Sequence, residues 1–133
     1  MVDALRSAHR ALHARGSVVD IHPTGSIATI EVDGVQAGKV DAGDASTRHN
    51  AATAAILQTV HDRLFEIESF REFTFYTYGD SAEELRDHVA DSWRDARIDE
   101  DTVRRMRAAL QTDARAKPRI SERVRITKLT PRG

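Results

Sequence analysis

The chain has 133 residues, the size of one ordinary domain, and its 40% hydrophobic and 31% charged residues are typical of a folded globular protein. It contains no cysteine, which excludes disulfides and thiolate metal sites. No apolar run approaches the roughly 20 residues that cross a bilayer. A net charge of −1 argues against a general attraction to nucleic acid. We therefore expect one cytoplasmic domain.

The amino-terminal part predicts a helix followed by a strand. Leucines and alanines at helical spacing favour a helix over residues 2–14, which Gly16 ends. Val18–Ile21 is a short apolar run, typical of a buried parallel strand, and the following His22-Pro23 ends it. These two elements open an alternating pattern of helices and strands.

Asp33-Gly34 is a strong hairpin signal, because a type I′ turn needs a positive φ at both central residues. It predicts paired strands over 27–32 and 35–40. A two-residue turn would place Val32 opposite Val35 and Ile30 opposite Ala37. We expect this hairpin to lie flat on an apolar surface.

The rest of the chain continues the alternation of helices and strands. The expected elements are a helix over 47–66, a strand over 73–78, a helix opened by the capping residue Ser81, a helix capped by Asp99, and a last strand over 120–129. This order predicts a layered α/β domain in which helices flank a mixed sheet, with the hairpin at about 27–40 as an insertion.

Several of these segments resemble the second half of class I S-adenosylmethionine-dependent methyltransferases, which are Rossmann-like. Residues 8–12 (AHRAL) and Gly16 are similar to the helix and turn that lead into the family's fifth strand, and 20–23 (DIHP) to the end of that strand. Residues 73–78 and 124–129 are similar to the sixth and seventh strands. The resemblance implies that residues 1–133 form a single methyltransferase-like half domain.

The cofactor-binding half of that family has no counterpart in this chain. Its glycine-rich turn and its ribose-binding acidic residue would both precede Met1, and residues 34–38 (GVQAG) are no substitute because they lie in a hairpin and open no helix. Residues 14–16 (ARG) stand where the family has a proline-glycine-glycine turn. We therefore expect no cofactor in the isolated chain, and S-adenosylmethionine only if another chain completes the domain.

Asp20 and His22 are the candidate catalytic residues, because they end a strand at the position where open α/β sheets place ligands. One interpretation makes His22 a general base that Asp20 orients, on the substrate side. The other interpretation is a polar pair that shapes the turn at Pro23. His9 and His13 share a helix face but have no acidic partner nearby in sequence, so we expect no metal site.

Three functional hypotheses follow. The first is a non-catalytic domain that acts by self-association or by binding a partner protein, and the second is the substrate-side half of a split methyltransferase. The third is a nucleic-acid binder, since ten basic and two acidic residues after position 102 give a local charge of +8. That segment has no interleaved row of aromatic residues, which disfavours nucleic acid. The first hypothesis predicts a homodimer through the edge of strand 18–21 or through the hairpin.

Overall fold

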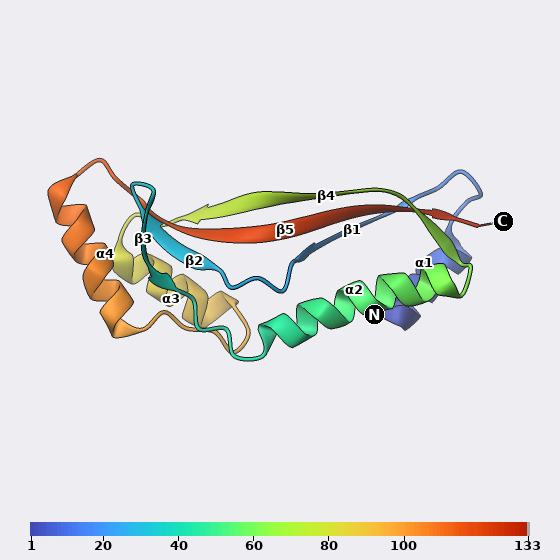
Figure 1. Cartoon of the computed structure of the whole chain (residues 1–133), viewed down its shortest axis with the longest axis horizontal. Coiled ribbons are helices and arrows are strands. Elements are labelled where there is room, and N and C mark those ends of the chain that lie inside the picture. The colour runs from blue at the N-terminus through green and yellow to red at the C-terminus, as the bar shows by residue number, and fades with distance from the viewer. Residues whose placement is uncertain (133) are drawn as a thin grey trace. The chain divides into compact units, whose positions relative to one another are not determined.

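A computed structural model describes residues 1–132 of the chain. In chain order, the elements are α1 (Val2–Ala11), β1 (Val18–Pro23), β2 (Thr29–Val32), β3 (Val35–Lys39), α2 (Ala45–His61), β4 (Phe65–Tyr78), α3 (Ala82–Ser92), α4 (Glu100–Thr112) and β5 (Pro118–Pro131) (Figure 1). They form two compact units. Unit 1 comprises Met1–Gly25, Thr47–Phe73 and Val124–Gly133, and unit 2 comprises Ser26–Ser46 and Thr74–Arg123.

β5 is the strand to which three others pair in a five-stranded sheet of order β1-β5-β2-β3. β1 pairs antiparallel with residues 124–129 of β5, and β2 pairs antiparallel with residues 118–121. β4 also pairs with β5. Side chains of β4 and β5 contact each other at Glu68–Lys128, Glu72–Arg125 and Tyr78–Arg119, so the numbers fall along β5 as they rise along β4. β4 is therefore antiparallel to β5 and occupies the edge opposite β1 and β2 (Figure 1).

The α/β class with flanking helices is confirmed, but the expectation of a mixed sheet was wrong. β1 and β2 each pair antiparallel with β5, and β2 and β3 form an antiparallel hairpin. An antiparallel sheet can leave one face in water. This explains why Val19 and Ile21 of β1 are exposed, although a buried parallel strand was expected there.

The hairpin turn is confirmed, whereas its register differs beyond the first pairs. Asp33 and Gly34 have φ values of 52° and 76°, and Val32 lies opposite Val35, as a type I′ turn requires. A register shift at Ile30 places that residue opposite Gly38 instead of Ala37. A β-bulge of this kind adds one residue to one strand and bends it.

The helix expected over 47–66 ends at His61, five residues early. Arg63 has a φ of 59°, so the chain leaves the helical conformation there, and Phe65 already begins β4. Leu64 and Ile67 continue the helical spacing from Val60, whereas Phe65 and Ile67 fit an alternating strand, so the apolar spacing did not separate the two structures. The helix caps, in contrast, are confirmed: Ser81 accepts a hydrogen bond from the N–H of Glu84, and Asp99 from the N–H of Thr102.

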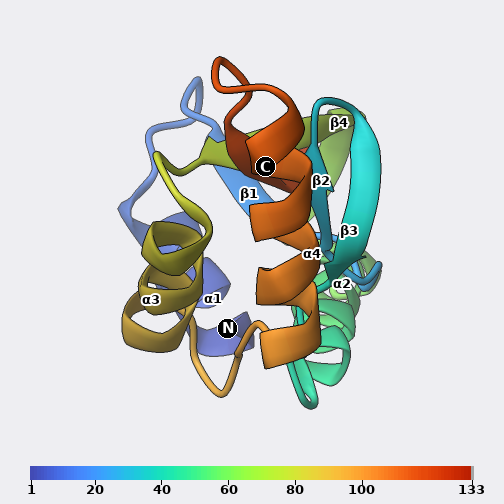
Figure 2. The same ribbon diagram turned by 90° about the vertical axis from the view of Figure 1, so that its left-hand side faces the viewer.

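Each unit has its own core. In unit 1, Leu5 of α1 and Ile56 of α2 pack against Phe65 and Leu129 of the strands. In unit 2, α3 and α4 cover one face of the strands (Figure 2). Its largest fully buried side chains include Ile30, Leu85, Val89, Val103, Met106 and Ile120.

The other face of unit 2 carries no helix. Side chains of successive strand residues point to opposite faces. Glu31 and Arg119 alternate with the buried Ile30 and Ile120, so they project away from α3 and α4. We call this surface the open face of unit 2. Arg119 contacts Glu31, Tyr76 and Tyr78 on it, and Thr74 lies on the same side of β4 as the two tyrosines. Its members are Glu31, Thr74, Tyr76, Tyr78 and Arg119.

Candidate functional site

Asp20 and His22 lie next to each other at the end of β1, as the sequence predicted, and a third residue joins them. The Nδ1 atom of His22 contacts the carboxylate of Asp20, and its Nε2 atom lies 3.0 Å from Oγ1 of Thr53 on α2. The Thr53 hydroxyl is also 3.4 Å from the carbonyl oxygen of His49 in the preceding turn. Thr53 was not identified from the sequence, because it is 31 positions away from His22.

This hydroxyl–imidazole–carboxylate chain has the order of groups found in hydrolase triads. Its burial does not suit a substrate: His22 is 9% exposed, and both of its ring nitrogens are engaged. Neither of the two cavities described below is lined by these residues. Burial, with smaller contributions from Arg48 and His22, lowers the pKa of the neighbouring His49. The arrangement therefore joins β1 to α2 within unit 1.

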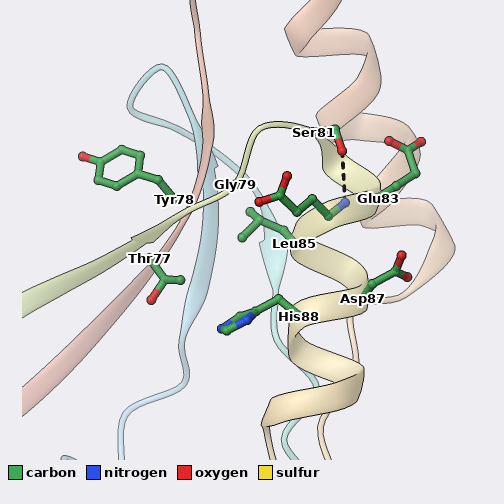
Figure 3. Close-up of a pocket in the computed structure, with 9 residues that line it drawn as sticks. Thr77, Tyr78, Gly79, Ser81, Glu83, Leu85, Asp87 and His88 are labelled. Carbon is green, nitrogen blue, oxygen red and sulfur yellow. Dashed lines mark hydrogen bonds between the residues drawn. The ribbon is translucent and has the colours of Figure 1, made fainter.

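A cavity of about 610 Å³ lies in unit 2, between the end of β4 and α3 (Figure 3). Its lining includes three acidic residues, Glu83, Glu84 and Asp87, beside His88. In Figure 3, His88 extends from α3 toward the side where Thr77 lies. A hydrogen bond to the backbone of Glu83 and the Arg107 guanidinium hold the pKa of the Glu83 carboxyl below its usual value.

A second cavity in unit 2, of about 340 Å³, has three cations and one carboxylate among its seven lining residues. We call it the basic pocket; its residues are Asp33, Gly34, Tyr78, Arg115, Ala116, Lys117 and Arg119. Lys117 pairs with Asp80 at 3.1 Å, and Arg119 pairs with Glu31 at 2.8 Å. No carboxylate among residues 1–132 pairs with the side chain of Arg115. An anion could therefore approach Arg115 without displacing an existing ion pair.

β4 presents the largest exposed apolar surface on a single element. Of its 14 residues, Phe65 alone is buried and Thr77 is partly buried. The exposed apolar and aromatic residues are Ile67, Phe70, Phe73, Phe75, Tyr76 and Tyr78. The sequence marked 73–78 as a strand but not as an edge, because strand order depends on pairing with a segment 41 or more positions away.

Within residues 1–132, no group of three histidine, cysteine, aspartate or glutamate side chains is placed to hold a metal ion. The ring of His9 packs edge-on against Phe65 at 5.2 Å, and its buried Nε2 atom has no hydrogen-bond partner in this part of the chain. Nor does any helix in the described region combine the length and apolar character of a membrane span.

Comparison with known proteins returns no relative: no protein family matches the sequence, and no curated protein and no solved structure is similar to the chain.

Proposed function

We propose that this chain is a non-catalytic domain that acts by self-association, and that two copies pair along the free edge of β4. The carrying observation is an exposed 14-residue edge strand that is rich in aromatic residues. An edge strand leaves a row of N–H and C=O groups available to another strand. Proteins usually protect such edges with charged side chains, especially lysine, with proline or with a short length. β4 is long and has neither lysine nor proline, and its four charged residues all lie within its first eight positions.

The aromatic surface on β4 is large enough for an interface. Phe70, Phe75 and Tyr78 are more than half exposed, and Phe73 and Tyr76 are 38% and 39% exposed. With about 200 Å² for a complete aromatic side chain, the five expose on the order of 500 Å² per chain. Two copies could therefore contribute up to about 1,000 Å² if all five side chains were completely buried, and backbone pairing along the edge would add to this area.

The sequence of β4 favours one antiparallel register with its own copy. Pairing centred on Glu72 would place two glutamates opposite each other, and pairing centred on Arg71 would do the same with two arginines. Centring on Phe73 removes like-charge pairs over residues 68–78. It brings Phe70 opposite Tyr76 and Arg71 opposite Phe75, which are aromatic and cation–π partners.

This proposal places the interface on β4 rather than on strand 18–21 or the hairpin. β1 also ends the sheet, but it has only six residues. β3 is similarly short, and Arg105 of α4 donates a hydrogen bond to the carbonyl oxygen of Ala37 on it. β4 thus offers the longest unpaired edge in the described part of the chain.

Light scattering at low micromolar concentration tests the proposal. We expect twice the 14.8 kDa chain mass for the wild type and the monomer mass for Phe73→Lys, because two lysines would meet at the centre of the pair. Mixing Phe73→Lys with Phe73→Glu should restore a dimer. The matched control is Ile21→Lys, an apolar position on β1 that is more exposed than Phe73 and should remain dimeric. A monomeric wild type, or a dimer that only Ile21→Lys dissociates, would overturn the assignment to β4.

The substrate-side half of a split methyltransferase is the second candidate. Its support is the neighbour order β1-β5-β4, which is the order that the resemblance implies for the fifth, seventh and sixth strands. The engaged, buried ring of His22 argues against a general base on that side. Titration calorimetry with S-adenosylmethionine separates the candidates: the self-association proposal expects no binding to the isolated chain.

A further inference from the structure

The fold places aromatic residues beside the basic carboxyl-terminal segment, which lacks them in sequence. Tyr76 and Tyr78 of β4 lie on the open face of unit 2, with ring centroids 6.3 Å apart. Arg119 of β5 reaches both of them: its guanidinium lies 4.0 Å above the Tyr76 ring and donates to the Tyr78 hydroxyl at 3.3 Å. Exposed aromatic rings interleaved with arginine on an open sheet are the features by which proteins bind single-stranded nucleic acid.

Tyr78 connects this surface to the basic pocket, because its ring is also part of the pocket lining. Tyr78 lines both cavities, and in Figure 3 its side chain extends away from α3, the helix that carries the acidic residues. The ring is 56% exposed, whereas Arg119 already covers the Tyr76 ring. Tyr78 is therefore the ring that is free to stack on a ligand.

The charges of the basic pocket set how strongly an anion would bind. Lys117 and Arg119 are partly neutralised by Asp80 and Glu31, which leaves Arg115 as the main free cation. A strand held by one or two phosphate contacts has a shallow salt dependence, with a log–log slope of about −0.7 to −1.4. Stacking must then provide most of the selectivity for single strands over duplexes and other polyanions.

We propose that this part of unit 2 binds a nucleotide of a single-stranded nucleic acid: one base stacks on Tyr78, and its phosphate lies in the basic pocket against Arg115 and Lys117. The proposal does not require self-association, although Tyr78 is also one of the five aromatic residues counted toward the β4 interface. A free nucleoside monophosphate offers the same base and phosphate and is included in the test.

The experiment is fluorescence anisotropy of a labelled single-stranded octamer with the full chain and four variants. Tyr78→Leu removes the stacking ring, and Arg115→Gln removes the free cation at an exposed position. Tyr78→Phe keeps the ring, and Arg104→Gln removes an exposed cation that pairs with Asp101 on α4, outside the pocket. Competitors are unlabelled octamer, a nucleoside monophosphate, a duplex of the same sequence, and heparin.

We expect Tyr78→Leu and Arg115→Gln each to weaken octamer binding by about fivefold or more, as loss of one stacked base or one phosphate contact implies. Tyr78→Phe and Arg104→Gln should bind like the wild type. The octamer should compete better than the duplex, and the monophosphate should compete at higher concentration. Absence of octamer binding, equal binding by Tyr78→Leu and the wild type, or competition by heparin alone would overturn the proposal.

Discussion

Replacing Thr53 with valine should destabilise unit 1 by removing one hydroxyl from the Asp20–His22–Thr53 chain while preserving its shape. Nε2 of His22 lies 3.0 Å from the Thr53 hydroxyl, and His22 is 9% exposed. A buried polar atom that loses its partner costs about 1–3 kcal/mol. Because Thr53 is itself partly exposed and water can reach it, we expect the lower part of this range, about 1–2 kcal/mol.

Urea unfolding of a double-mutant cycle measures the effect directly. The cycle compares the wild type, Thr53→Val, His22→Ala and the double variant. It requires that the free energy of unfolding has the same slope against urea concentration in all four. Since the two residues share one hydrogen bond, their effects should not add, and a coupling of at least about 0.5 kcal/mol is expected. The matched control is Thr47→Val, a threonine at the start of the same helix that makes no contact with His22.

Additive effects within about 0.3 kcal/mol would refute this reasoning, because they would mean that the hydroxyl and the imidazole do not depend on each other. A change in binding of a ligand or partner without any loss of stability would refute it in a second way. That result would instead support the sequence-based interpretation of His22 as a substrate-side general base that Asp20 orients.

Three further substitutions test the fold of unit 2. Gly38→Ala should destabilise the chain by about 1–3 kcal/mol in urea unfolding, because its Cβ would lie 2.3 Å from Oγ1 of the buried Thr102. Adding Thr102→Ala should relieve part of this loss. Equal stability of Gly38→Ala and the wild type would contradict the close packing of Gly38 on Thr102. Glu122→Gln should stabilise the chain at neutral pH, since burial raises the pKa of this carboxyl above its ordinary 4.5. The gain in stability should disappear as the pH falls through the raised pKa, because the carboxyl of the wild type is then protonated too. A gain that does not depend on pH would contradict burial of the charged carboxyl as its cause. Gly34→Val should lower the melting temperature because a β-branched residue resists the φ of 76°, and an unchanged melting temperature would exclude a type I′ turn.

The parts of the fold that sequence reasoning predicted are those determined by a few adjacent residues. The turn at Asp33-Gly34 and the caps at Ser81 and Asp99 follow from local backbone requirements, and all three are present. The beginning of β4 was missed because Ile67 suits either a helix, with Val60 and Leu64, or a strand, with Phe65. Pairing with β5 decides between them, and that pairing depends on residues more than 50 positions away, as in Glu68–Lys128.

The candidate sites divide in the same way. The Asp20–His22 contact joins residues two positions apart and was expected, whereas Thr53 comes from a different helix and was not. The row of aromatic residues next to the basic segment was judged absent because only neighbours in sequence were compared. Tyr78 and Arg119 are 41 positions apart, and strand pairing alone brings them together.

A cysteine placed at the centre of β4 tests the central claim most directly, because the chain has no cysteine of its own. Residues opposite each other in an antiparallel pair have Cα atoms about 4.5–5.5 Å apart, within the range that a disulfide spans. On oxidation we expect Phe73→Cys to form a covalent dimer. Glu72→Cys and Thr74→Cys should crosslink only when mixed, since the Phe73-centred register places 72 opposite 74. No crosslink at Phe73→Cys together with efficient crosslinking of Ile21→Cys on β1 would contradict pairing along β4.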